Sequence, residues 1–92
     1  MSKLIKRTNK PFKCRADKTL MKELRQKDLD NEPIYIQDVF KLNDFLLFKE
    51  YDYKMNRYVK NGAELLMAIS EIVQVDDRGM AVILKEMIKF RN

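Results

Sequence analysis

The sequence predicts a small α+β domain with one N-terminal helix and about five or six mostly antiparallel strands. Apolar residues follow helical spacing between residues 18 and 27. Later segments are alternating or continuously apolar and are separated by turn-forming residues, which is the pattern of strands. Near the C-terminus, the turn Asp76-Asp77-Arg78-Gly79 lies between two apolar segments, as in a β-hairpin.

The chain has 92 residues, enough for one domain with a single core of modest size. Its 46% hydrophobic and 36% charged residues are typical of a soluble globular domain. No apolar run approaches the roughly 20 residues that a membrane-spanning helix needs. Residues 1–13 contain basic side chains without the apolar stretch of a signal peptide. We therefore expect a cytoplasmic protein with no membrane partner.

The residue types exclude several kinds of site. With one cysteine, Cys14, and no histidine, the chain cannot form an internal disulfide or a Cys/His zinc site. Asp28, Asp30 and Glu32 alternate, but the glycine and distal glutamate of an EF-hand do not follow at the required positions. Only two glycines are present, so a Gly-rich phosphate loop is excluded as well. We expect no metal, no cofactor and no catalytic residue set.

The net charge of +5 is unevenly distributed along the chain. Residues 1–27 hold ten Lys and Arg against two Asp and Glu, residues 28–52 hold two against seven, and residues 53–92 hold seven against five. The sequence predicts a flexible basic arm over residues 1–10, followed by a single domain over residues 11–92. Such an arm either attracts a phosphate backbone or is simply a solvated terminus. Its cations are Lys3, Lys6, Arg7 and Lys10.

The first elements follow from local pattern. Alternation of apolar and basic residues after Pro11 predicts a strand over residues 12–16. We expect Cys14 to be a small structural residue of this strand. Asp17 can cap the helix that follows, whose face with Leu20, Met21 and Leu24 is expected to be buried. We expect this helix to end near Lys27 and an acidic loop to span residues 28–33.

The second half contains the remaining strands. Residues 34–39 alternate as a strand, and a turn at Asn43-Asp44 leads into a strand over residues 45–51 that we expect to be buried on both faces. A broad loop covers residues 52–62. Residues 63–74 fit either a helix capped by Asn61 or the first strand of the hairpin, and spacing alone does not decide between them. Asp76 and Asp77 are expected to bond to the backbone of the turn.

Four motifs occur in order after Phe40: Asn-Asp at 43–44, Leu-Phe-Lys-Glu-Tyr-Asp at 47–52, Tyr-Val-Lys-Asn at 58–61 and Gly-Met-Ala-Val-Ile-Leu at 79–84. In this order and spacing the segment 40–90 resembles the phage and prophage branch of the ASCH family. The resemblance implies a PUA-like β-barrel, makes residues 63–74 a strand, and places a phage-encoded chain in the host cytoplasm. It also implies that Glu50 and Asp52 hold the following loop through hydrogen bonds and that Gly79 permits the turn.

The chain departs from the family upstream of these motifs. Glu32, Tyr35 and Gln37 stand where the family's Gly-x-Lys-x-x-Glu-x-Arg signature has its lysine, glutamate and arginine. Some family members hydrolyse acylated modified nucleosides with a lysine, a threonine and that glutamate, because the reaction needs an amine or hydroxyl beside a carboxylate base. The loop at 58–61 has likewise lost the family's Thr-Gly-Arg. We do not carry the hydrolase activity over to this chain.

One constellation suggests a function. Three tyrosines lie within eight residues, interspersed with cations. Tyrosine faces stack on bases while lysine and arginine contact phosphates, so the sequence predicts binding of RNA or single-stranded nucleic acid. The alternative is that Tyr51 and Tyr58 only pack on the sheet and the cations only solvate the loop. The predicted contact residues, besides the arm, are Lys49, Tyr53, Lys54, Arg57, Tyr58 and Lys60.

Two other functions compete with nucleic-acid binding. A small phage protein could bind and modulate a host protein through apolar Met55 or through acidic side chains, which are Asp28, Asp30, Glu32 and Asp38. The third hypothesis is a hydrolase acting on a modified nucleoside. It requires a Lys/Glu pair such as Lys49 with Glu50 or Lys27 with Glu32, and their spacing gives it no support.

Overall fold

One helix and six strands make up the part of the chain that the computed structural model describes, residues 10–87. The fold class is therefore α+β, as predicted. In chain order the elements are β1 (Phe12–Ala16), α1 (Lys18–Asp30), β2 (Ile34–Ile36), β3 (Phe45–Asp52), β4 (Arg57–Tyr58), β5 (Glu64–Val75) and β6 (Met80–Glu86).

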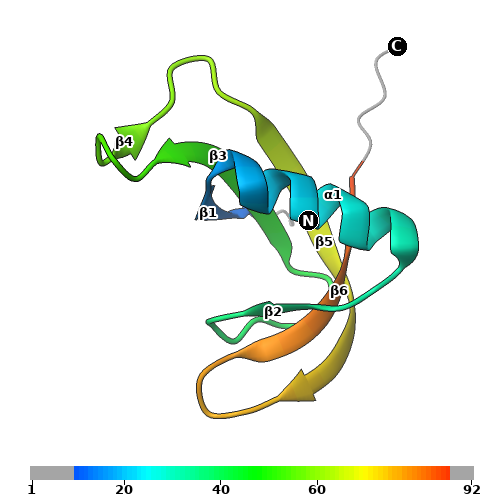
Figure 1. Ribbon diagram of the computed structural model, residues 1–92. Helices are drawn as coiled ribbons and strands as arrows, with labels where there is room; N and C mark the ends of the chain where they lie inside the picture. The colour runs from blue at the N-terminus through cyan, green and yellow to red at the C-terminus, as the bar shows by residue number, and fades with distance from the viewer. Residues whose placement is uncertain (1–9, 88–92) are drawn as a thin grey trace, which may run out of the picture.

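The strands form a mixed sheet that curls into a half-barrel (Figure 1). Its order is β1-β3-β5-β6-β2, with the short β4 paired only to β3. The pairing of β1 with β3 is parallel, and all other pairings are antiparallel. Register shifts between Ile69 and Glu71 and between Ile72 and Gln74 accompany the bend of β5 against β6. The helix α1 lies across the half-barrel and contacts β1, β3 and β6.

The core fills the space between α1 and the concave face of the sheet. Met21 and Leu24 on α1 are buried, which confirms the predicted apolar helix face. Each large apolar side chain removed from water contributes about 1.5–3 kcal/mol to stability. The buried side chains of the strands are Leu46, Phe48 and Tyr51 on β3, Leu65, Met67 and Ile69 on β5, and Met80, Val82, Ile83 and Leu84 on β6, of which Tyr51 and Ile83 lie outside the main core cluster.

Several sequence predictions are confirmed. Residues 12–16 form β1, and the Asp17 side chain caps α1 by accepting a hydrogen bond from Leu20 N at 2.8 Å. Residues 63–74 are strand rather than helix, and the predicted hairpin joins β5 to β6. Because Leu65, Met67 and Ile69 all face the core at a spacing of two, the strand reading satisfies burial at every second position.

Other predictions are wrong in their bounds. The helix does not end near Lys27 but continues to Asp30, because Asn31 adopts a left-handed conformation (φ 55°) and donates its N–H to Asp28 O. The strand predicted over residues 34–39 ends at Ile36, and the loop 52–62 contains β4. β3 is not fully buried on both faces: Leu46 and Phe48 are buried, whereas the intervening residue is half-buried.

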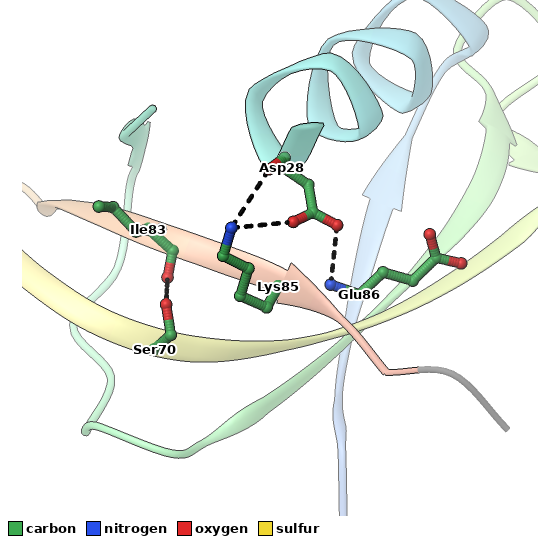
Figure 2. Close-up of polar contacts among 5 residues, drawn as sticks. All are labelled: Asp28, Ser70, Ile83, Lys85 and Glu86. Atoms are coloured by element: carbon green, nitrogen blue, oxygen red, sulfur yellow. Dashed lines mark hydrogen bonds and ion pairs between the residues drawn. The ribbon is translucent and has the colours of Figure 1, made fainter. Parts of the chain in front are cut away.

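Asp28 joins the end of α1 to the end of β6 (Figure 2). Its carboxylate lies 3.4 Å from Lys85 Nζ and accepts a hydrogen bond from Glu86 N at 3.1 Å. Its backbone carbonyl accepts a second bond from Lys85 Nζ at 3.2 Å. On the neighbouring strand, Ser70 Oγ donates to Ile83 O at 3.1 Å beside the register shift. Asp28 is thus part of the last helical turn and not of an acidic loop.

A hydrogen bond joins the turn between β5 and β6 to β2. The Asp76 carboxylate accepts hydrogen bonds from Arg78 N, Gly79 N and Tyr35 Oη, each at 2.8 Å, which confirms a structural role for Asp76. The backbone bond from Arg78 and the phenol bond from Tyr35 lower the pKa of Asp76, and the same carboxylate raises the pKa of Tyr35. Gly79 does not have a positive φ. Instead, a Cβ at Gly79 would overlap Ile36 O, so glycine permits the close approach of the turn to β2.

We expect Asp28→Ala to lower the free energy of unfolding by about 1 kcal/mol, since the end of α1 loses a charged acceptor for Glu86 N and a partly exposed ion pair with Lys85. Urea denaturation followed by circular dichroism measures the loss. Asp30→Ala is the matched control, because within residues 10–87 that carboxylate bonds only to the exposed Gln26 side chain. Equal losses for the two variants would show that Asp28 does not join the helix to β6.

Asp76→Asn is expected to destabilise the fold at neutral pH. A carboxyl with a lowered pKa in the folded state stabilises it above its unfolded pKa, and that contribution is lost as the pH falls through the folded value. The difference in urea midpoint between the parent and Asp76→Asn should therefore shrink as the pH is lowered below about 4. A difference that stays constant down to acidic pH contradicts the charged role of Asp76.

Candidate nucleic-acid interface

Three tyrosine rings gather where β3 ends and β4 begins. The ring centroid of Tyr51 lies 4.9 Å from that of Tyr53 and 5.1 Å from that of Tyr58, both in edge-on arrangements. Tyr51 is buried, whereas Tyr53 and Tyr58 are 54% and 42% exposed. The buried ring therefore supports two exposed ones. We call Tyr51, Tyr53 and Tyr58 the tyrosine cluster.

Local hydrogen bonds hold the chain that carries these rings. The Asp52 carboxylate accepts from Lys54 N at 2.9 Å and from Met55 N at 3.2 Å, and Asn56 makes the turn in a left-handed conformation. Glu50 Oε1 accepts from Ala63 N at 3.0 Å at the far side of the loop. The roles expected for Glu50 and Asp52 are confirmed. In the resulting β3–β4 pairing, Tyr51 lies opposite Tyr58.

Two cations lie over the rings. Arg15 Cζ is 4.4 Å from the centroid of Tyr51, and Lys49 Nζ is 5.5 Å from the centroid of Tyr58. Such cation–π contacts contribute about 0.5–1 kcal/mol at exposed sites. In the parallel β1–β3 pairing Arg15 is the register partner of Lys49, so two positive charges stand side by side. Lys49 is partly neutralised by Glu64, 3.6 Å away.

The other predicted contact residues surround the cluster. Lys54, Arg57 and Lys60 are exposed, and within residues 10–87 none of them makes an ion pair. Between positions 49 and 60 four cations face two acids, and both acids already accept backbone hydrogen bonds. A hollow beside the cluster is lined by Lys18, Tyr53 and Lys54 and also by the acids Asp17, Glu50 and Asp52. These three carboxylates accept backbone hydrogen bonds.

The basic arm lies mostly outside the described residues. This applies to Lys3, Lys6 and Arg7, whereas Lys10 is exposed just before β1. No local pattern joins Arg15 or Lys18 to the tyrosines, although Arg15 lies over the Tyr51 ring and Lys18 lines a hollow together with Tyr51 and Tyr53. Only the β1–β3 register, which pairs residues more than thirty positions apart, brings them together. A local sequence pattern carries no signal for that contact.

A second hollow, of about 450 Å³, opens between β1, β2 and α1. Its walls are mainly apolar, and Tyr35 and Gln37 lie among its polar residues, whereas Glu32 is exposed and pairs with Lys27 at 3.5 Å. Burial, together with nearby Asp38, raises the pKa of the Cys14 thiol in this hollow. A thiol with a raised pKa holds less thiolate at neutral pH and is a weaker nucleophile, so Cys14 lines the hollow as a structural residue.

The acidic residues considered for protein docking are largely engaged. Asp28 bonds Lys85 and Glu86, Asp30 accepts from the Gln26 side chain, and Glu32 pairs with Lys27. Among residues 10–87, no group of three or more His, Cys, Asp or Glu side chains is arranged to hold a metal ion. Within the same range, no helix is long and apolar enough to cross a membrane.

Comparison of the chain with protein-family models, curated proteins and solved structures found no match. The function must therefore be inferred from the geometry of the molecule. The tyrosine cluster combines two exposed aromatic rings with neighbouring cations, Lys54, Arg57 and Lys60, that form no ion pair in the described part of the chain.

Proposed function

We propose that this chain is a PUA-like domain of the ASCH type that binds RNA or single-stranded nucleic acid through the tyrosine cluster. The observation that carries the proposal is the pair of exposed rings, Tyr53 and Tyr58, held edge-on against buried Tyr51. Bases stack on such rings, and each stacked base contributes about 1–3 kcal/mol.

Preorganisation supports this role. The hydrogen bonds of Asp52 and Glu50 and the β3–β4 pairing hold the loop before any ligand arrives, so binding orders few further groups. Lys54, Arg57 and Lys60 supply positive charge to the same surface without ion-pair partners in the described residues. Stacking platforms surrounded by cations are typical of proteins that bind single strands with little sequence preference.

The assignment to the ASCH type is supported by the resemblance of the segment 40–90 and agrees with a curled mixed sheet carrying one helix. The nucleoside hydrolase activity of some family members is not part of the proposal. Lys49 pairs with Glu64, and Glu50 bonds to Ala63 N, so these two residues do not form a Lys/Glu dyad. A host-protein partner would rest on exposed Met55, because Asp28, Asp30 and Glu32 are engaged within the described residues.

The first experiment is a fluorescence titration of labelled single-stranded RNA, single-stranded DNA and duplex at two salt concentrations. Phosphate contacts release counterions, so binding to a single strand should weaken with a slope of about −0.7 in log affinity against log salt for each contact. Preference for single strands over duplex supports the proposal. Absence of binding at low salt contradicts it.

Replacing Tyr53 and Tyr58 together with alanine is expected to weaken single-strand binding by at least about tenfold, because at least one stacked base is lost. The Tyr→Phe double variant keeps both rings and should retain most of the affinity. Met55→Ala is the matched control in the same exposed loop. Unchanged affinity of the double alanine variant excludes stacking on these rings.

Neutralising the arm by glutamine at Lys3, Lys6, Arg7 and Lys10 is expected to reduce the salt slope by up to about 3, since each lost phosphate contact removes about 0.7. The preference for single strands should remain, because it comes from the tyrosine cluster. Titrations over a range of salt concentrations measure both quantities. An unchanged slope shows that the arm does not touch the phosphates.

A further inference from the structure

We infer that a single strand bound at the tyrosine cluster continues along one side of α1, where Lys18, Lys22 and Arg25 contact its phosphates. This inference rests on the proposed function and extends it by naming the path of the strand. Lys18 lines the hollow that also contains Tyr51 and Tyr53, so the path begins beside the rings. In Figure 1 the helix starts near β3 and runs away from β4.

The three cations share one stripe of the helix. At about 100° per residue, positions 18, 22, 25 and 29 fall within an arc of about 60°. Lys18, Lys22, Arg25 and Leu29 are all exposed. The stripe lies on the side of the helix opposite Leu20 and Lys27, and it borders the side that faces solvent. Along the helix axis, Lys18 and Arg25 are about 10 Å apart.

The acids of α1 form no ion pair with this stripe in the described residues, although Glu23 and Asp30 line a shallow hollow together with Lys22 and Arg25. Glu23 and Asp30 lie about 80–160° around the helix from the three cations. Asp28 lies closer, but its carboxylate is bonded to Lys85 and Glu86 N on β6. Within residues 10–87, none of Lys18, Lys22 and Arg25 forms an ion pair.

Like charges spaced by three and four residues repel each other and cost helix stability. Within the described part of the protein no ion pair relieves that repulsion. A polyanion that lies along the stripe would therefore be attracted by all three cations. A single strand matches the stripe better than a compact anion, because its phosphates repeat along its length. The tyrosine cluster at the start of the stripe favours a ligand that also carries bases.

The test compares two double variants that remove the same charge. K22Q/R25Q removes the two stripe cations that lie farther from the tyrosine cluster than Lys18. K41Q/R78Q removes two exposed cations elsewhere, on the Phe40–Asp44 turn and on the β5–β6 turn. Glutamine is a good helix former, so the first variant should fold, which circular dichroism verifies. The probes are oligothymidine strands of about 4 and about 12 nucleotides, lengths within the usual range of single-strand sites.

For the long strand, K22Q/R25Q should reduce the slope of log affinity against log salt by about 1.4, because two phosphate contacts are lost. When the salt concentration rises fourfold, the affinity of the parent should then fall about sevenfold more than that of the variant. The short strand, which occupies the tyrosine cluster, should show no such change, and K41Q/R78Q should leave both slopes near those of the parent. An unchanged long-strand slope in K22Q/R25Q, or an equal reduction in K41Q/R78Q, overturns the path along α1. Either result leaves the proposed function standing if the Tyr53/Tyr58 variant still loses affinity, whereas absence of binding by the parent overturns both.

Discussion

The parallel pairing of β1 with β3 is the constraint on which the candidate site depends. It is the one parallel pairing in the described sheet, and it places a strand from the basic N-terminal third beside the strand that ends in the tyrosines. Because β1 leads directly into α1 through the Asp17 cap, the same pairing also positions the start of the helix beside Tyr51 and Tyr53. Segments that are far apart in the sequence thus form one surface.

That pairing has an electrostatic consequence. Arg15 and Lys49 are register partners, and like charges on neighbouring strands are unfavourable. The fold lowers this cost by placing each cation over a tyrosine ring and by pairing Lys49 with Glu64. The remaining positive charge is concentrated at the end of the sheet where Tyr53 and Tyr58 are exposed. These contacts stabilise the cluster, whereas Lys54, Arg57 and Lys60, which form no ion pair in the described residues, supply the charge on which the proposed phosphate contacts depend.

Local patterns predicted the elements whose causes are local. The alternation in β1, the Asp17 cap and the Asp76 turn were visible in the sequence, because each depends on residues a few positions apart. Spacing left residues 63–74 open between helix and strand, because the burial that decides it comes from the pairing of β5 with β3 and β6. The end of α1 was misjudged, since its last turn is held by Asn31 and by the bonds of Asp28 to β6. The tyrosine cluster was anticipated from composition, but the contribution of Arg15 depends on strand register, which spacing does not reveal.

The hollow between β1, β2 and α1 differs from the tyrosine surface in what it can bind. Its walls are mainly apolar, with Lys13, Arg15 and Asp38 among its charged residues, and burial raises the pKa of its thiol, so it offers no activated cysteine nucleophile. The surface around the tyrosine cluster offers exposed rings on a loop held by Glu50 and Asp52. Affinity for a flexible polyanion comes from many weak contacts spread over a surface rather than from one enclosed pocket. The distribution of charge and aromatic rings therefore supports the outer surface at the β3–β4 end, continued along α1, as the proposed binding surface.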